Sequence, residues 1–376
     1  MTPVPFRQFV LKVHSRCNLA CDYCYVYEMA DQSWRDQPLR MSEATADRTV
    51  QRIAEHVEAH RLPSVAVILH GGEPLLAGTA FLAGLVRRMR DTVPGRVDVS
   101  MQTNGVLLTE AGLEALVGLG VRIGVSLDGD AGATDRHRSF ADGRSSHPHV
   151  ERALRLLARE EFKDAFDGLL CTVDVEQPPL RTYRALLAYA PPAIDFLLPH
   201  GTWSHPPPRR GIGSKGTPYA DWLLAVFEQW YDRPETWVRL FGELVQSALG
   251  GTPAVEGLGL RPSTVAVVDT DGAIKQLDSL SAAYPGAADL GLNVVDDAFD
   301  VALTHPLTRL RQGGLESLSA TCRSCAVVRT CGGGLFTHRY DSATGFANPS
   351  VYCADLLRLV TAVQARVSAD LARPGR

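Results

Sequence analysis

The run Cys17-Asn-Leu-Ala-Cys21-Asp-Tyr-Cys24 closely follows the apolar stretch Phe9–Val13 near the start of the chain. The apolar stretch predicts a buried strand, so the cysteines are expected in the loop after it. Three thiolates this close together can surround one inorganic cluster, because thiolate is the ligand that iron–sulfur centres take. A tetrahedral zinc or a fully ligated four-iron cluster needs a fourth ligand, and none lies nearby in sequence. The triplet therefore predicts a cluster with one iron left open.

Working outward from this loop, short apolar runs alternate with helical patterns. A helix is expected to begin at Ser42, a suitable N-cap, and a closing helix is expected near Asp355–Leu371. Parallel strands need long crossover connections, so strands separated by helices predict a parallel sheet. Six stretches predict its strands: Phe6–Val13, Val65–Leu69, Val97–Thr103, Arg122–Leu127, Gly168–Val173 and Asp195–Leu198.

Polar and glycine-rich residues come directly after the first four predicted strands, in the cysteine loop, His70–Pro74, Thr103–Gly105 and Ser126–Gly129. In (β/α) barrels the active site is built at that end of the strands. An open doubly wound sheet would place the ligand at a single switch point instead. The sequence therefore predicts an α/β fold with a partial (β/α)6 TIM barrel over residues 1–203. Residues 204–260 are expected to form a connector with bridging helices, and residues 261–376 a second, cysteine-bearing domain.

Composition excludes several classes of protein. The net charge is −4, from 38 basic and 42 acidic residues, which argues against nucleic acid or an anionic membrane as partner. The short basic pair Arg209-Arg210 is expected in a solvated loop. No run reaches the roughly 18 apolar residues of a membrane span, and Arg7 and Lys12 interrupt the N-terminal apolar run, which is unlike a signal peptide. Eight cysteines then indicate metal or redox chemistry in a reducing compartment, so a cytoplasmic location is expected.

A second cysteine group lies near the C-terminus. Cys322, Cys325 and Cys331 are followed by Cys353, and four thiolates can close one site around either a zinc ion or a four-iron cluster. The spacing leaves both alternatives open. The remaining cysteine, Cys171, lies in the fifth predicted strand, where a lone cysteine usually acts as a small buried hydrophobe.

Together, the barrel motifs resemble the radical S-adenosylmethionine (radical SAM) superfamily. Its hallmark is a Cys-x3-Cys-x2-Cys loop with an aromatic residue, here Tyr23, before the last cysteine. The resemblance implies a [4Fe-4S] cluster on Cys17, Cys21 and Cys24 whose open iron binds SAM. It also implies that the run Gly71-Gly72-Glu73-Pro74 holds the SAM amino group, with Glu73 supplying a carboxylate. The other polar positions that it implies for SAM binding are Asn104, Ser126, Asp128 and Arg138.

The C-terminal cysteine spacing resembles the SPASM extension of radical SAM peptide maturases. This resemblance implies one auxiliary [4Fe-4S] cluster on Cys322, Cys325, Cys331 and Cys353, with zinc as the alternative. A first auxiliary cluster is implied to be lost, because Gln276-Leu277-Asp278 and Leu335 stand where cysteines are expected. Several stretches are similar to the FxsB family: Arg7–His14, Cys24–Glu28, Leu198–His200 with Trp203, and His338–Tyr340.

FxsB-type enzymes are implied to act on ribosomal precursor peptides with a Phe-x-Ser-x-x-type C-terminus. The implied reaction starts with a 5′-deoxyadenosyl radical and joins an aromatic ring to a residue Cβ, which makes a three-residue cyclophane. A flavodoxin- or ferredoxin-type protein is the implied electron donor. The resemblance makes Asp278 a candidate catalytic base, although a solvated turn aspartate is the alternative reading.

Two further residues and one segment are candidates for substrate handling. His200 and Trp203 are candidate substrate contacts or parts of a packed loop, and Ser204–Gly216 is a candidate lid. Peptide epimerisation, with Cys171 as hydrogen donor, or thioether formation are alternative reactions. A non-catalytic iron–sulfur sensor or peptide-binding scaffold is the alternative from a different class.

Overall fold

The computed structural model describes residues 3–211 and 213–373, and its ten strands form one sheet. The strand order is β10-β9-β8-β1-β2-β3-β4-β5-β6-β7. All six predicted strands are confirmed and run parallel: β1 (Gln8–His14), β2 (Ser64–Gly71), β3 (Arg96–Thr103), β4 (Arg122–Ser126), β5 (Phe166–Thr172) and β6 (Ala193–Leu197). The prediction of a partial α/β barrel is therefore confirmed.

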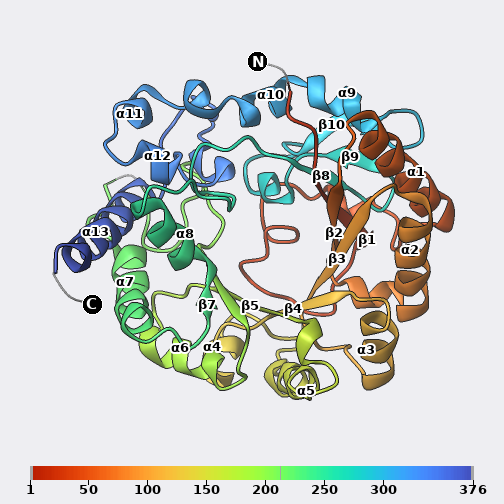
Figure 1. Ribbon diagram of the computed structural model, residues 1–376, viewed down its shortest axis with the longest axis horizontal. Helices are drawn as coiled ribbons and strands as arrows, with labels where there is room; N and C mark the ends of the chain where they lie inside the picture. The colour runs from red at the N-terminus through yellow and green to blue at the C-terminus, as the bar shows by residue number, and fades with distance from the viewer. Residues whose placement is uncertain (1–2, 212, 374–376) are drawn as a thin grey trace.

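Helices cover the outer face of the curved sheet, as Figure 1 shows. The predicted N-cap at Ser42 is confirmed, since its Oγ accepts a hydrogen bond of 3.0 Å from the Thr45 amide. The barrel helices are α1 (Glu43–Ala59), α2 (Thr79–Thr92), α3 (Glu110–Val117), α4 (Ala131–Asp135), α5 (His147–Leu157) and α6 (Pro179–Leu187). Two more, α7 (Pro218–Asp232) and α8 (Arg239–Ala248), follow the connector.

The sheet extends beyond the six predicted strands at both edges. The short strand β7 (Trp237–Val238) pairs with β6, and β8 (Val265–Val268) pairs in parallel with β1. The antiparallel strands β9 (Ala273–Lys275) and β10 (Asp289–Asn293) complete the edge beyond β8. Segments from outside residues 1–203 thus share one sheet with the barrel. The domain limits at residues 203 and 260 remain a prediction.

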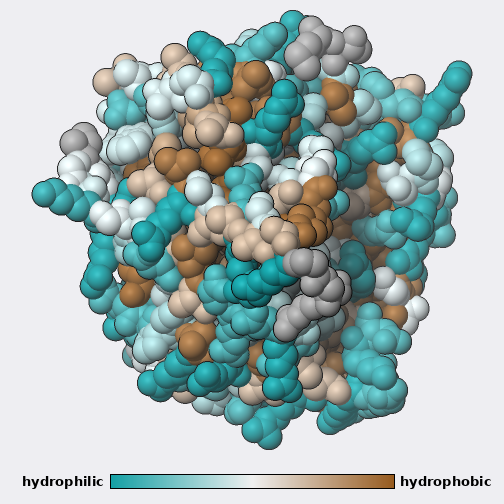
Figure 2. All heavy atoms as spheres, turned by 60° about the vertical axis from the view of Figure 1, so that its left-hand side comes forward, coloured by the Kyte–Doolittle hydropathy of each residue, from teal (hydrophilic) through white to brown (hydrophobic). Residues whose placement is uncertain are grey.

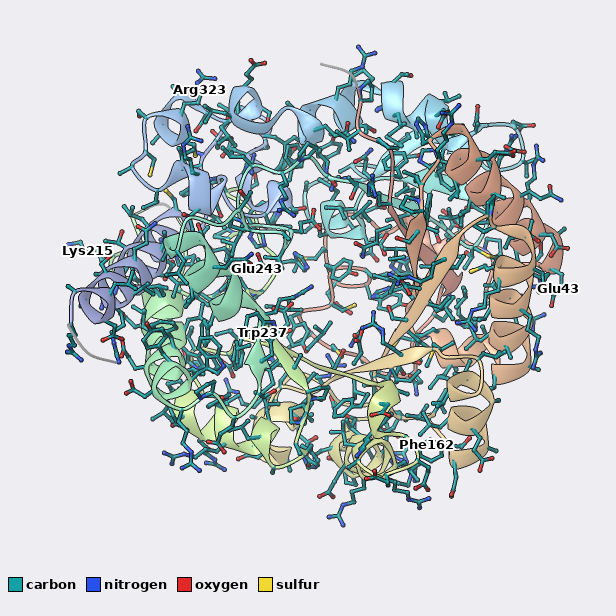
Figure 3. All side chains as sticks on the ribbon, in the orientation of Figure 1. Glu43, Phe162, Lys215, Trp237, Glu243 and Arg323 are labelled. Atoms are coloured by element: carbon teal, nitrogen blue, oxygen red, sulfur yellow. The ribbon has the colours of Figure 1, made fainter. Side chains whose placement is uncertain are left out.

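The two faces of the sheet differ in chemistry, because successive side chains of a strand point to opposite faces. On the outer face, Phe9, Leu11 and Val13 of β1 are fully buried against the helices. On the inner face, polar residues are only partly buried. They include His14 of β1, His70 of β2, Asp98, Ser100 and Gln102 of β3, and Ser126 of β4. In Figure 3, Glu43, Lys215 and Arg323 lie near the rim of the molecule, whereas Trp237 and Glu243 lie closer to its middle. The inner face is therefore a polar, partly accessible surface.

The C-terminal region crosses the opening between the two ends of the sheet (Figure 1). Its helices are α9 (Phe299–Thr304), α10 (Pro306–Gln312), α11 (Ala320–Arg323), α12 (Val328–Cys331) and α13 (Cys353–Leu371), the last of which confirms the predicted closing helix. Figure 2 shows that the face carrying α13 is mainly hydrophilic, with separate hydrophobic patches. Within residues 3–211 and 213–373, every helix is too short or too polar to cross a lipid bilayer.

Candidate active site

The Cys17–Cys24 loop leaves β1 and is held on two sides by backbone hydrogen bonds. On one side, the amides of Gly72 and Glu73 donate to the carbonyl oxygens of His14 and Arg16, at 2.8 and 3.0 Å. On the other side, the Ala20 amide donates to the Ser139 carbonyl at 2.9 Å. The loop is therefore fixed between the end of β2 and the segment after α4.

The two glycines of the Gly71–Pro74 run are required by this contact. Gly71 has a φ of +148°, and a Cβ there would lie 2.3 Å from the His14 carbonyl oxygen. A Cβ on Gly72 would lie 2.4 Å from the Arg16 carbonyl oxygen. Both distances are far shorter than any real contact, so a side chain would push away the loop that carries the cysteines.

The cysteine triplet has the chemistry of a metal-cluster site. All three side chains are partly buried and free of disulfides. Burial raises the pKa of Cys17 to about 12 and that of Cys21 to about 11, and the neighbouring Cys24 thiol acts in the same direction on both. Three thiols gathered in a poorly solvated loop favour a cationic partner that neutralises their thiolates. The residues present therefore fit an iron–sulfur cluster.

The spacing of the sulfur atoms bears on which metal fits. Within the described parts of the chain, no three cysteine sulfurs lie within 4.8 Å of one another. Thiolates on a single tetrahedral zinc would lie about 3.8 Å apart, given Zn–S bonds of about 2.3 Å. In a four-iron cluster each thiolate binds a different iron, so the sulfurs stand further apart. In both cysteine groups the sulfurs are therefore spaced more widely than the thiolates on one tetrahedral zinc ion, and the choice of metal stays a prediction.

Glu73 lies at the end of β2 and is fully buried. Its carboxylate accepts hydrogen bonds from the amides of Leu75 (3.0 Å) and Asn104 (2.8 Å) and from the Thr103 hydroxyl (2.7 Å). Burial raises its pKa, although these hydrogen bonds act in the opposite direction. These three hydrogen bonds join the ends of β2 and β3 and occupy three of the roughly four acceptor sites of a carboxylate. The predicted contact of Glu73 with the SAM ammonium stays a prediction.

Asn104 is also engaged with the protein, next to the cysteine loop. Its Nδ2 donates to Asn18 Oδ1 at 2.8 Å and lies 3.6 Å from Cys17 Sγ. Its Oδ1 accepts from the Val106 amide at 2.9 Å. The side chain thus positions Cys17, which is a contact that the resemblance did not imply. Ser126, at the end of β4, accepts a hydrogen bond of 2.9 Å from Gln102 Nε2 on the inner face.

Tyr23, Asp128 and Arg138 form one network beside the cysteines. The Tyr23 hydroxyl donates to Asp128 at 2.5 Å and accepts from the Arg138 guanidinium at 2.8 Å. The second Asp128 oxygen accepts from the Thr172 amide at 2.9 Å. Arg138 is 8% exposed, and its Nε is buried without a hydrogen-bond partner. A buried guanidinium with a free N–H is suited to an anion such as a carboxylate.

The second cysteine group comes together from α11, α12 and the first residue of α13. Burial raises the pKa of Cys331 to about 11, and Cys353 and Cys322 lie close enough to raise it further. The Arg339 guanidinium, beside this group, donates to the carbonyls of Gly332, Gly333 and Gly334 at 2.7, 3.1 and 2.9 Å. All three glycines have positive φ, which lets their carbonyls converge on one side chain. The group therefore sits in a rigid frame that fits four-thiolate ligation.

Asp278 lies beside Lys12 of β1 and is buried rather than exposed to solvent. It is 8% exposed and begins the short 3-10 helix η4 (Asp278–Ala282). Its Oδ1 is 3.7 Å from the Lys12 ammonium of β1, and its Oδ2 is buried without a partner. A second carboxylate, Asp269, is 3.3 Å from the same ammonium. Burial alone would lower the pKa of Lys12, but the two aspartates raise it. The alternative reading of Asp278 as a solvated turn residue was wrong.

Four rings in edge-to-face and tilted contact connect the two cysteine regions. Tyr25, next to Cys24, lies 4.8 Å from the His200 ring, measured between centroids. His200 lies 5.7 Å from His338, which lies 5.0 Å from Tyr352, next to Cys353. Burial lowers the pKa of His200 to about 4. These ring contacts pack the segment after β6 against both cysteine segments, so His200 has a packing role.

The structure also places three other residues that the sequence analysis singled out: Cys171, Trp203 and Arg210. Cys171 of β5 is fully buried within the hydrophobic core, as expected for a small buried hydrophobe, and its role as a hydrogen donor stays an alternative. Trp203 belongs to a packed loop, since its Nε1 donates to the Pro349 carbonyl at 2.8 Å. Arg210 is not solvated: its side chain is 6% exposed and lies 3.2 Å from Asp355 of α13. Arg209 is 57% exposed, as expected. The candidate lid is therefore anchored beside Cys353, and Ile212 falls outside the described residues.

Comparison with known proteins identifies the family. Residues 11–173 match the model of the radical SAM superfamily, which covers the cysteine loop and the first five strands. These residues form a radical SAM domain. Its similarity to curated relatives extends past the barrel. A serine-type anaerobic sulfatase-maturating enzyme of Klebsiella aerogenes is 26% identical over 360 residues, which cover 90% of this chain and 81% of that protein. A cysteine-type enzyme of Clostridium perfringens is 22% identical, over 93% and 94%.

Solved structures agree with this fold. The structure described as native anSMEcpe with bound AdoMet has a TM-score of 0.82 and 21% identity, and covers 96% of this radical SAM enzyme and 98% of that chain. Streptococcus suis SuiB bound to its precursor peptide SuiA has a TM-score of 0.59 and 15% identity, over 93% and 76%. The shared fold thus includes the C-terminal extension.

Several residues of this site carry little signal in the sequence. Lys12 lies within a strand pattern, and Tyr25 and His338 both meet His200 only in the folded chain. His70 lies close enough to Lys12 and Asp278 for their charges to act on its pKa. The clue available for Lys12 was its charge at an inward position of an apolar strand, because a buried lysine needs a partner. The role of His137 also carries little signal in the sequence, because its side chain links the cysteine loop to the segment after β5 only in the folded chain.

His137 predicts a pH dependence of stability. Its Nδ1 lies 2.9 Å from Asp22 and its Nε2 lies 3.2 Å from Asp174. Burial lowers the pKa of His137, but the two carboxylates outweigh it and raise the pKa overall. A raised folded-state pKa means that the stabilisation is complete below the unfolded value of about 6.5 and is lost as pH rises through the folded-state pKa.

We therefore expect His137→Gln to lower the free energy of unfolding by up to about 1 kcal/mol near pH 6, and by much less above about pH 8. Urea unfolding of both proteins at the two pH values measures this difference. His205→Gln, at an exposed loop histidine, serves as control. An equal loss at both pH values would show that the ion pairs contribute nothing.

Proposed function

We propose that this radical SAM enzyme modifies a ribosomally made precursor peptide by joining an aromatic ring to the Cβ of another residue, which forms a three-residue cyclophane. The observation that carries the proposal is the partly exposed, polar inner face of the barrel, with the cysteine loop after β1 and Asp278 beside Lys12 of the same strand. Similarity to the FxsB stretches supports the cyclophane chemistry, and the peptide-bound SuiB structure supports a peptide as substrate. The expected peptide ends in a Phe-x-Ser-x-x-type motif.

The residues that would hold the cofactors are defined by the site. Cys17, Cys21 and Cys24 would hold a [4Fe-4S] cluster, and the second cysteine group would hold an auxiliary [4Fe-4S] cluster. When bound, SAM and the first cluster supply a 5′-deoxyadenosyl radical that removes a hydrogen atom from the substrate, and the auxiliary cluster supplies an electron acceptor. The reducing electron is expected from a flavodoxin- or ferredoxin-type donor.

This chain's own residues position SAM for that chemistry. The Arg138 guanidinium, with its free Nε–H, faces the place where we expect the SAM carboxylate. Tyr23 and Asp128 hold that guanidinium in place through the hydroxyl between them. The carbonyls of Gly71 and Gly72 are the proposed acceptors for the ammonium, with Pro74 starting the turn behind them. Ser126 lies on the inner face, where we expect the ribose.

Asp278 is the proposed base. Forming a bond to an aromatic ring releases a proton from that ring, and a base must lie within hydrogen-bond reach of it. The Asp278 Oδ2 is a buried acceptor without a partner, so it is available to take this proton. Lys12, held between Asp278 and Asp269, keeps positive charge beside the carboxylate.

We expect Asp278→Asn to reduce cross-linked product by about 100-fold, within the range of general-base contributions, while 5′-deoxyadenosine still forms. Mass spectrometry of the peptide and chromatography of the nucleoside measure the two outcomes separately. Asp289→Asn, at an exposed position of β10, is the matched control. Unchanged product in Asp278→Asn would rule out this residue as the base.

The reaction itself is tested by incubating cluster-loaded enzyme with SAM, dithionite and a candidate peptide. Formation of a cyclophane removes two hydrogens from the peptide, and the product resists fragmentation between the joined residues. Epimerisation leaves the mass of the peptide unchanged. A product of unchanged mass would overturn the cyclophane assignment, and SAM cleavage without any change in the peptide would overturn the proposed substrate. Absence of SAM cleavage would favour the sensor or scaffold alternative.

The second candidate function is maturation of a sulfatase. It is favoured by the similarity to sulfatase-maturating enzymes over 90% of this chain. Co-expression with an immature sulfatase separates the two candidates. Gain of sulfatase activity supports maturation, whereas a change confined to the short peptide supports the cyclophane proposal.

A further inference from the structure

Two histidines and an aspartate meet on the outer surface, away from both cysteine groups. His56 lies in the last turn of α1, and His60 follows one turn later, so both point from the same side of the helix. Asp300 comes from the first turn of α9. Its Oδ1 lies 2.6 Å from His56 Nδ1 and 2.9 Å from His60 Nε2. Among the described residues, this is the one group of three ligand atoms within 4.8 Å of one another.

The ring of His56 faces an acceptor at each nitrogen. Its Nε2 lies 3.2 Å from the Phe6 carbonyl oxygen, and its Nδ1 faces the Asp300 carboxylate. A neutral imidazole has a single N–H, so it can satisfy one of these acceptors. Donation from Nε2 to the carbonyl leaves the Nδ1 lone pair directed at the carboxylate oxygen. A bound cation between these two atoms resolves that repulsion.

The surroundings resemble the support that metal-binding histidines receive. A ligating histidine typically donates its other N–H to a backbone carbonyl, which fixes the ring orientation. His56 is 2% exposed, and the rings of Phe6, Phe9 and Phe299 pack around it with centroids 5.8, 5.9 and 6.2 Å away. This ligand is therefore held rigidly before any ion binds.

The other two ligands face solvent. The side chains of His60 and Asp300 are 29% and 46% exposed, so an ion can enter and a water can fill a fourth position. With metal–ligand bonds of about 2.0–2.1 Å, tetrahedral ligands lie about 3.3 Å apart. The Asp300 oxygen would need to withdraw by roughly 0.4–0.7 Å, which its exposure permits.

We propose that His56, His60 and Asp300 bind a divalent transition-metal ion, best matched by Zn²⁺, which joins the barrel helix α1 to the C-terminal helix α9. Two imidazoles and one carboxylate are a donor set that suits zinc. The same two regions already meet through Arg52, whose Nε donates to the Val294 carbonyl at 2.9 Å. The ion would add a second link between the barrel and the region that carries the second cysteine group.

Equilibrium dialysis of cluster-loaded protein against ZnCl₂, followed by metal analysis, tests the proposal. We expect one additional zinc per chain without loss of iron, which shows that the cysteine sites are not exchanged. We also expect the midpoint of thermal unfolding to rise by a few degrees with zinc. His60→Ala should weaken zinc binding by at least about tenfold and abolish the thermal shift. His205→Ala, at an exposed histidine of another loop, should behave as wild type.

Asp300→Asn provides a second variant that keeps the side-chain shape and removes the charge, and it should also weaken zinc binding. Iron content reports whether each variant is folded. Equal zinc binding by wild type and both variants would overturn the site, as would the absence of additional zinc in the wild type. Zinc uptake that releases iron in equal amount would place the metal at the cysteines and overturn the proposal.

Discussion

Replacing Cys17 with alanine is expected to abolish reductive SAM cleavage, down to the level of protein without a cluster. The reason is that three thiolates are the minimum that holds the proposed cluster, and Cys17 is also the cysteine that Asn104 and the Leu19 amide contact, at 3.6 and 3.4 Å. Cys21→Ala and Cys24→Ala are expected to behave in the same way. Anaerobic incubation with SAM and dithionite, with 5′-deoxyadenosine measured by chromatography, gives the result directly.

The matched control for this experiment is Cys171→Ala. Cys171 is fully buried in the core, outside both cysteine groups, so its loss should leave iron content and SAM cleavage intact. A modest loss of stability is expected, because a small cavity remains. The same variant also tests epimerisation, since a product that depends on Cys171 would support it as a hydrogen donor. Wild-type SAM cleavage by Cys17→Ala would refute the assignment of the first cysteine group.

Replacing Arg138 with glutamine is expected to weaken SAM binding by roughly 10- to 100-fold. A hydrogen bond to a charged group contributes about 1.5–3 kcal/mol, and about 1.4 kcal/mol corresponds to a factor of ten. The guanidinium is buried, and its unpartnered Nε leaves room for one charged acceptor. Asp128 stays hydrogen-bonded to Tyr23 and to the Thr172 amide in the variant, so the fold should persist. Calorimetric titration of cluster-loaded protein with SAM measures the change.

Arg136→Gln is the control for the Arg138 variant, because Arg136 lies two residues away, is 44% exposed and pairs with Asp174. It should bind SAM as wild type does. If Arg138→Gln also binds SAM with wild-type affinity, the carboxylate is held elsewhere and the network with Tyr23 and Asp128 serves only to fix the cysteine loop.

Local sequence patterns predicted much of the barrel. The six strands and the Ser42 cap follow from apolar periodicity and from a side chain that bonds its own neighbours, which are short-range effects. The same patterns did not predict that β8 pairs with β1, because a short apolar run such as Val265–Val268 does not identify its partner strand. Pairing between strands more than two hundred residues apart depends on the tertiary arrangement of the whole chain, not on the local conformational preference of either strand.

For the candidate site too, the sequence predicted some features and the fold decided others. Cysteine spacing indicated the metal chemistry, because one short loop carries its three ligands. Burial and pairing depended on the fold: Glu73 became an internal carboxylate with three hydrogen bonds, Arg210 a buried cation beside Asp355, and Cys171 a core residue. Exposure is set by the elements that pack over a residue, and those elements come from distant parts of the chain.

The amino-acid order alone established the α/β barrel, the two cysteine groups and the radical chemistry that they imply, since each depends on residues close together in the chain. The folded arrangement alone established that Asp278 is buried beside Lys12. It also established the ring contacts that connect the two cysteine regions, through Tyr25, His200, His338 and Tyr352. The physical reason is that charge pairing and ring packing act between side chains in space, so their partners are known only once the chain has folded.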